Sequence, residues 1–159
     1  TKIENEAADL YEQSRFGEKK GSKIVYDLVE ALYLLEKEKL VILDGKKSLD
    51  FDSFLKQVRK NDKDFLIKYT VYKDMRSRGY IVKTALKFGA EFRVYDRGVK
   101  PGDDHAKWVL FPVPESQVLT WYDFAAKNRV AHSTRKRLLL GVVDSELDVS
   151  YWECKWTGP

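Results

Sequence analysis

The sequence is poor in the residues that build disulfide frameworks and transition-metal sites. Its 159 residues include one cysteine, Cys154, and two histidines, His105 and His132. A single cysteine excludes an intramolecular disulfide and a cysteine-rich zinc site, and two histidines leave few ligands for any transition metal. The longest apolar run, residues 138–143, is far too short to span a membrane. We therefore expect a cytoplasmic chain that does not enter a membrane.

The composition that remains is that of a globular protein with a small basic excess. Hydrophobic residues make up 43% of the chain, charged residues make up 34%, and the formal net charge is +4. This apolar content suffices for the core of one medium domain or of two small ones. The basic excess permits a polyanionic partner without requiring one.

The first half of the chain has helical periodicity. Apolar residues recur at a spacing near 3.6 in three segments: residues 24–35, 51–60 and 65–78. Ser22 is the expected N-cap of the first helix, and residues 40–43 are expected to form a short strand. Gly79, which follows two cationic residues, is the expected end of the third helix.

After Gly79 the apolar period changes from 3.6 to 2. The alternation predicts five strands: residues 80–84, 91–95, 107–113, 136–143 and 148–156. Thr120 and Asp123 form a capping-box pattern that opens a helix ending near Val130. We therefore predict a chain of the α+β or α/β class with two domains, a small helical one with a short sheet over residues 1–66 and an α/β one over residues 67–159.

Three polar residues of the second half are candidates for chemistry. Tyr95 shares a strand face with Glu91 and Arg93, which predicts a solvent-exposed position. His105 ends the following loop, and an imidazole with an ordinary pKa of about 6.5 suits proton transfer at neutral pH. Lys136 follows a basic segment that suits either a phosphate site or a solvated helix end. Taken singly, all three are also compatible with ordinary surface positions.

The order of these three residues resembles the Tyr-His-Lys triad of the archaeal tRNA-splicing endonucleases. Nine residues separate Tyr95 from His105, and thirty separate His105 from Lys136. The resemblance extends over nearly the whole chain and is carried by six segments: residues 11–17, 28–35, 78–84, 87–95 (KFGAEFRVY), 104–108 and 129–137.

This resemblance implies a fold and a reaction. The C-terminal domain is expected to have the mixed sheet of a restriction-endonuclease-like fold. The implied reaction is a cofactor-free cleavage of precursor tRNA at bulge-helix-bulge junctions, which leaves a 2′,3′-cyclic phosphate and a 5′-hydroxyl. The family roles are base for Tyr95, acid for His105 and electrostatic stabiliser for Lys136. Because a phenol with a pKa near 10 is a weak base at neutral pH, positioning the 2′-hydroxyl is an alternative role for Tyr95.

The same resemblance suggests how the RNA is held. Arg129 matches an arginine that sandwiches a bulged base, and such stacking is favourable for cationic planes. The second arginine of that sandwich is expected near the C-terminus, where this sequence has tryptophans instead. Trp152 or Trp156 is the expected replacement, and core or interface packing is the alternative role for both.

An acidic cluster lies between the last two predicted strands. Asp144, Glu146 and Asp148 fall within five residues, and because their carboxylates repel each other, we expect that they do not stabilise an isolated hairpin. The resemblance implies that this loop inserts into a basic cleft of a neighbouring subunit and so builds a tetrameric assembly of units. A homotetramer, a heterotetramer with a structural subunit, and a catalytic part of a longer fused chain all remain open.

Two other functions are compatible with parts of the sequence. Metal-dependent DNA nucleases of the same fold carry an Asp and a later Glu-x-Lys, and Asp144 with Glu153 and Lys155 matches that pattern superficially. A non-catalytic subunit of a splicing assembly is the second alternative, although such subunits lack the triad. The resemblance itself implies no metal.

Overall fold

The computed structural model describes residues 5–158 and separates the chain into two compact units, the first ending at Tyr69 and the second beginning at Thr70. The division falls inside helix α4 (Phe65–Ser77), and the boundary expected near residue 66 lies in the same helix. Within the described residues, no helix is long and apolar enough to cross a membrane.

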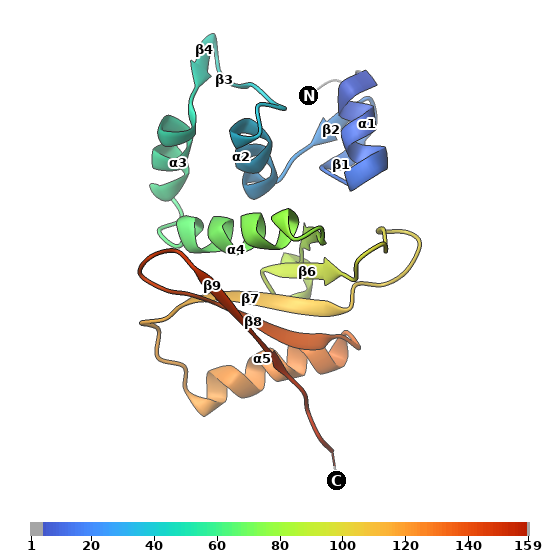
Figure 1. The fold of residues 1–159 in the computed structure, drawn as a ribbon, viewed down its shortest axis with the longest axis vertical. Coiled ribbons are helices and arrows are strands. Elements are labelled where there is room, and N and C mark those ends of the chain that lie inside the picture. Colours follow the sequence, from blue (N-terminus) through green and yellow to red (C-terminus); the bar gives the residue numbers. More distant parts are fainter. Residues whose placement is uncertain (1–4, 159) are drawn as a thin grey trace. The chain divides into compact units, whose positions relative to one another are not determined.

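The first unit combines short helices with two antiparallel hairpins (Figure 1). Its elements before α4 are α1 (Asn5–Ser14), β1 (Glu18–Lys20), β2 (Lys23–Val25), α2 (Leu28–Glu36), β3 (Ile42–Asp44), β4 (Lys47–Leu49) and α3 (Phe51–Arg59). Strand β1 pairs with β2, and β3 pairs with β4. Ile24, Leu32 and Leu34 are almost fully buried and form part of its core.

The expected start of the helix over residues 24–35 is wrong. Residues 23–25 form strand β2, and the helix begins at Leu28 with Asp27 rather than Ser22 as its N-cap. The buried carboxylate of Glu30 accepts hydrogen bonds from the backbone N–H groups of Gly17 and Asp27, each at 3.1 Å. This carboxylate fixes the helix start through a partner 13 residues away, which a local periodicity does not reveal.

The second unit is a five-stranded mixed sheet. Its strands are β5 (Ile81–Thr84), β6 (Phe92–Tyr95), β7 (Trp108–Pro114), β8 (Arg137–Val143) and β9 (Val149–Cys154), hydrogen-bonded in that order. Only the β7–β8 pair is parallel among these neighbours, and helix α5 (Trp121–Ser133) makes the crossover between them. A short 3₁₀ turn, η1 (Leu86–Phe88), connects β5 to β6. The expected α+β chain with a mixed-sheet C-terminal domain is confirmed.

Both faces of this sheet are covered by helices (Figure 1). Beneath α5, six residues form a core cluster: Ala85, Ala90, Val109, Phe111, Ala131 and Leu138. On the other face, the ring of Tyr72 from α4 lies 5.8 Å from that of Phe92. A Cβ added at Gly141 would lie 3.0 Å from Val71 of α4, so the sheet and this helix are in close contact.

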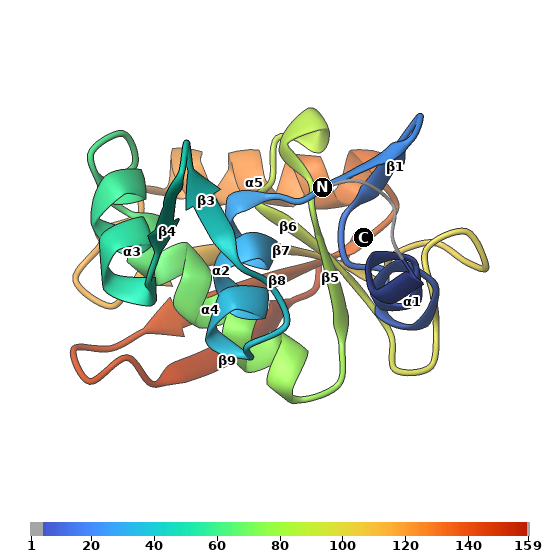
Figure 2. The ribbon, with the colours of Figure 1, turned by 90° about the horizontal axis from the view of Figure 1, so that it is seen from above.

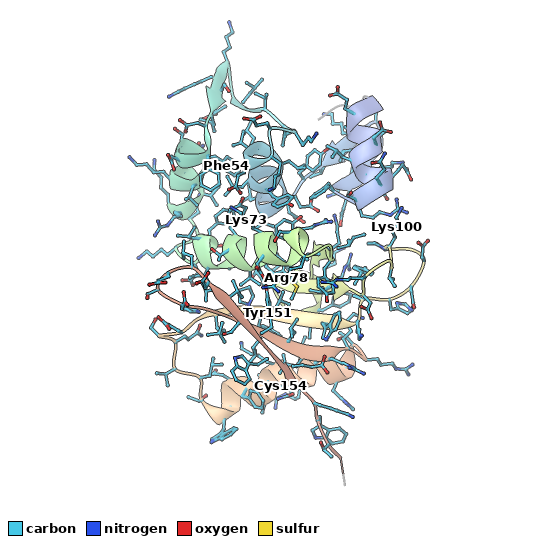
Figure 3. All side chains as sticks on the ribbon, in the orientation of Figure 1. Phe54, Lys73, Arg78, Lys100, Tyr151 and Cys154 are labelled. Atoms are coloured by element: carbon cyan, nitrogen blue, oxygen red, sulfur yellow. The ribbon has the colours of Figure 1, made fainter. Side chains whose placement is uncertain are left out.

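A polar network joins α4 to the edge strand β9. The Tyr151 hydroxyl donates to Oδ2 of Asp74 at 2.8 Å, and Nε of Arg78 donates to the same oxygen at 2.8 Å. Figure 3 shows Arg78 and Tyr151 next to each other, with Cys154 further along β9 toward α5. Burial, with the Asp74 carboxylate, raises the pKa of Tyr151. The predicted end of α4 at Gly79 is confirmed by its positive φ of 88°.

Candidate active site

Tyr95, His105 and Lys136 line one cavity of about 360 Å³ in the second unit. Six further residues complete its lining: Phe88, Arg93, Gly102, Asp103, Asp104 and Ala106. The three predicted residues come from a strand end, a loop and a helix end that are distant in sequence. The fold therefore brings a phenol, an imidazole and an amine to the same space.

Tyr95 is buried at the end of β6, with only 6% of its surface exposed. The expected exposure of its strand face is therefore wrong. Arg93 on the same face is opposite Val109, which belongs to the core cluster beneath α5. Because helices cover both faces of the sheet, alternation here separates two buried environments rather than core from solvent.

His105 is exposed on the loop that joins β6 to β7. The base of this loop is closed by Lys107, whose Nζ donates to Oδ2 of Asp96 at 2.7 Å and whose N–H donates to the Val94 carbonyl at 2.9 Å. The Lys107 ammonium, followed by the backbone N–H of Arg97, lowers the pKa of Asp96. This clamp ties the loop that carries His105 to the sheet.

Lys136 is held by the C-terminal end of α5. Its N–H donates to the Ala131 carbonyl at 2.8 Å, and the preceding residue, Arg135, has a left-handed φ of 53° and donates to His132. This pair of bonds is the Schellman arrangement that ends many helices. Nζ of Lys136 donates to the Thr134 carbonyl at 3.2 Å and lies 5.8 Å from the centre of the Phe88 ring.

The predicted capping box at the start of α5 is confirmed. The N–H of Asp123 donates to the Thr120 hydroxyl at 3.1 Å, and the Thr120 N–H donates back to the Asp123 carboxylate at 3.0 Å. The helix continues to Ser133, three residues beyond the expected end near Val130. With this added length, Lys136 lies three residues after the last residue of the helix.

A second, larger cavity of about 830 Å³ lies between α5 and the end of the chain. Arg129 and Trp156 both line it, whereas Trp152, which is 63% exposed, does not. The Trp156 ring contacts that of His132 with centroids 5.2 Å apart. Further lining residues that sequence reasoning missed lie on one face of α5, at helical spacing: Trp121, Ala125, Asn128 and His132.

The acidic turn between β8 and β9 is internally bonded, contrary to expectation. Oδ1 of Asp144 accepts the backbone N–H groups of Glu146 and Asp148, each at 2.9 Å. Leu147 completes the turn with a φ of 66° and is 44% exposed. Figure 2 shows the turn at the outer end of the hairpin. Asp144 thus stabilises the hairpin, while Glu146 and Asp148 remain exposed at its tip.

Comparison with known proteins identifies the family. The profile of the tRNA intron endonuclease catalytic C-terminal domain matches residues 65–151, and that of the tRNA intron endonuclease N-terminal domain matches residues 2–55. The chain belongs to the tRNA intron endonuclease family. The predicted family and its catalytic domain are both confirmed.

Archaeal relatives span most of the chain. It is 47% identical to a tRNA-splicing endonuclease of Thermococcus onnurineus over 147 residues, which cover 92% of this chain and 84% of the relative. The chain is 47% identical to a tRNA-splicing endonuclease of Pyrococcus furiosus over 142 residues, which cover 89% of this chain and 81% of the relative. It is 45% identical to a tRNA-splicing endonuclease of Nanoarchaeum equitans over 150 residues, which cover 87% of this chain and 96% of the relative.

The geometry of this tRNA intron endonuclease does not support the DNA-nuclease pattern. Glu153 pairs with Leu139 across the β8–β9 ladder, five residues before Asp144. At about 3.3 Å per residue the two carboxylates are separated by roughly 16 Å, too far to share one ion. Glu153 instead accepts Trp108 Nε1 at 2.7 Å and Arg137 at 3.0 Å, which lower its pKa.

Proposed function

We propose that this chain cleaves precursor tRNA at bulge-helix-bulge exon–intron junctions by a metal-independent transesterification. The observation that carries the proposal is that Tyr95, His105 and Lys136 line the same cavity. These groups match the needs of an internal phosphoryl transfer, namely a site for the nucleophile, a proton donor and a cation on the phosphorus.

Each of the three groups has one role in the reaction. The ribose 2′-oxygen attacks the adjacent phosphorus, the P–O2′ bond forms, and the P–O5′ bond breaks. Tyr95, which is buried, positions the 2′-hydroxyl, and the hydroxyl proton passes either to the Tyr95 phenolate or to solvent water. His105 gives a proton to the departing 5′-oxygen, and Lys136 stabilises the negative charge of the pentacovalent phosphate. The products are a 2′,3′-cyclic phosphate and a 5′-hydroxyl.

The mechanism is tested with His105→Ala and with an altered substrate. The variant should slow cleavage at saturating RNA by the roughly 10²–10⁴-fold typical of a lost general acid, without loss of binding. Wild-type protein should act in excess EDTA and leave a cyclic phosphate, and an RNA with a 2′-deoxy scissile nucleotide should stay intact. Cleavage of that RNA, or a product with a 5′-phosphate, would exclude this chemistry.

We further propose that Arg129 and Trp156 stack on a bulged base, because both line the 830 Å³ cavity. Loss of either side chain should remove about 1–2 kcal/mol of stacking, or roughly 5–30-fold in cleavage of bulged RNA. Trp152→Ala is the matched control, since Trp152 is equally exposed but lies outside that cavity. A larger effect of Trp152→Ala than of Trp156→Ala would reverse the assignment.

The assembly proposal concerns the tip of the β8–β9 hairpin. Its exposed Glu146 and Asp148, together with Leu147, suit insertion into a basic cleft of a neighbouring subunit, either identical or structural, in a tetrameric assembly of units. Glu146→Lys with Asp148→Lys should dissociate the assembly in a salt-sensitive way, measured by sedimentation at micromolar concentration. Asp144→Ala, which removes the acceptor of both turn hydrogen bonds but keeps the charges at the tip, is the control for damage to the turn. An unchanged mass of the double variant would refute the docking.

A further inference from the structure

A fourth polar group, Arg93, faces the cavity of the proposed active site. It precedes Tyr95 by two residues on β6, so the two side chains leave the strand on the same face. Both line the 360 Å³ cavity. Building on the proposed function, we propose that the Arg93 guanidinium donates hydrogen bonds to the non-bridging oxygens of the scissile phosphate and is a catalytic residue beside Lys136.

The first observation is an unsatisfied donor. Nε of Arg93 is buried, and it is the one buried side-chain nitrogen or oxygen without a hydrogen-bond partner among the described residues. The Phe88 ring lies beside the guanidinium, with its centre 5.9 Å from Cζ of Arg93. Buried donors are nearly always paired in folded proteins, so a guanidinium that lines the cavity and keeps an unpaired Nε is suited to an anionic ligand.

The second observation is that cationic groups converge on this space. Nζ of Lys136 lies 5.8 Å from the centre of the same Phe88 ring. Arg93 and Lys136 both line the cavity beside Tyr95 and His105. A phosphate bound in this cavity would therefore lie next to two cationic side chains.

The carboxylates that line the cavity do not pair with the Arg93 guanidinium. Asp103 and Asp104 line it, but no ion pair joins either of them to Arg93 in the part of the chain that the structure describes. Oδ1 of Asp104 instead accepts the His105 N–H at 2.7 Å, which orients the loop. The guanidinium is thus left for an external anion.

The chemistry of the two cations is complementary. A guanidinium presents a planar fork that fits two oxygens of one phosphate, whereas an ammonium acts as a point charge. During the transfer, negative charge builds up on the non-bridging oxygens, so donors aimed at them accelerate the reaction. Arg93 would orient the phosphate through its fork while Lys136 adds charge.

The test compares Arg93 with Arg97, an exposed arginine outside the cavity that stacks on Tyr80 at 4.9 Å. Arg93→Gln should lower the single-turnover rate at saturating bulge-helix-bulge RNA by roughly 10²-fold, the scale of a lost oxyanion donor, with little change in RNA affinity. The rate of Arg93→Lys should lie between those of wild type and Arg93→Gln. Millimolar guanidinium chloride should restore part of the lost rate of Arg93→Ala and should not increase the wild-type rate.

Each outcome is decisive for the proposal. If Arg93→Gln and Arg97→Gln have equal rates at saturation, or if Arg93 variants lose activity only in proportion to lost thermal stability, Arg93 does not contact the phosphate. Absence of guanidinium rescue, with Arg93→Lys as slow as Arg93→Gln, also overturns the proposal. The proposed function is judged separately, by the cyclic phosphate formed in EDTA and by the inactivity of His105→Ala.

Discussion

Arg135 occupies a backbone conformation that disfavours any side chain. Its φ of 53° is left-handed, and it lies between the end of α5 and Lys136. The hydrogen bonds from Arg135 to His132 and from Lys136 to Ala131 hold it there. Replacing Arg135 with glycine or with alanine removes the same guanidinium, so the two variants differ mainly in their tolerance of this conformation.

The difference in stability follows from two opposing terms. The left-handed conformation costs an L-residue about 1–2 kcal/mol, which glycine avoids. Glycine costs about 0.5–1 kcal/mol of stability relative to alanine, because the unfolded chain has more conformational entropy at a glycine and loses it on folding. Arg135→Gly should therefore be more stable than Arg135→Ala by about 0.5–1 kcal/mol, which corresponds to roughly 1–4 °C in Tm for a chain of this size.

Urea unfolding at pH 7, followed by circular dichroism, measures this difference. The control is Ala125→Gly in the interior of α5, where glycine should instead destabilise the protein by about 1 kcal/mol. Because both Arg135 variants lose the same charge, any loss of RNA affinity should be common to them. An alanine variant as stable as the glycine variant would refute the helix-end geometry that positions Lys136.

Three further outcomes are expected. The pKa of Asp96 is lowered by Lys107, so its carboxylate stabilises the fold above the unfolded value of about 3.9 and loses that effect as the pH falls through the lower folded value. The stability advantage of wild type over Asp96→Asn should thus be present at pH 6 and vanish in acid melts; a constant difference would contradict it. Gly141→Ala should cost about 1–3 kcal/mol in urea melts because its Cβ would lie 3.0 Å from Val71, and an unchanged midpoint would mean that α4 yields without strain. Thr120→Ala should cost about 1 kcal/mol by loss of the cap, whereas Thr120→Ser should recover most of it in the same assay.

Local signals were sufficient for most elements of the fold. The capping box at Thr120 and the glycine after α4 each act within a few residues, and the sequence predicts both. The expected helix over residues 24–35 was wrong at its start because its N-cap depends on Glu30 and the distant Gly17. Strand β4 was missed because three residues give too short a pattern for alternation to be detected.

The candidate site also depends on contacts between segments that are distant in the sequence. Spacing and the family resemblance named Tyr95, His105 and Lys136 from the sequence by itself. Only the tertiary structure decided that all three line one cavity, that Tyr95 is buried, and that Arg93 joins them with an unpaired nitrogen. Alternation in a strand reports which side chains share a face, but what covers that face is set by packing of distant segments, here α5 and the loop before β7.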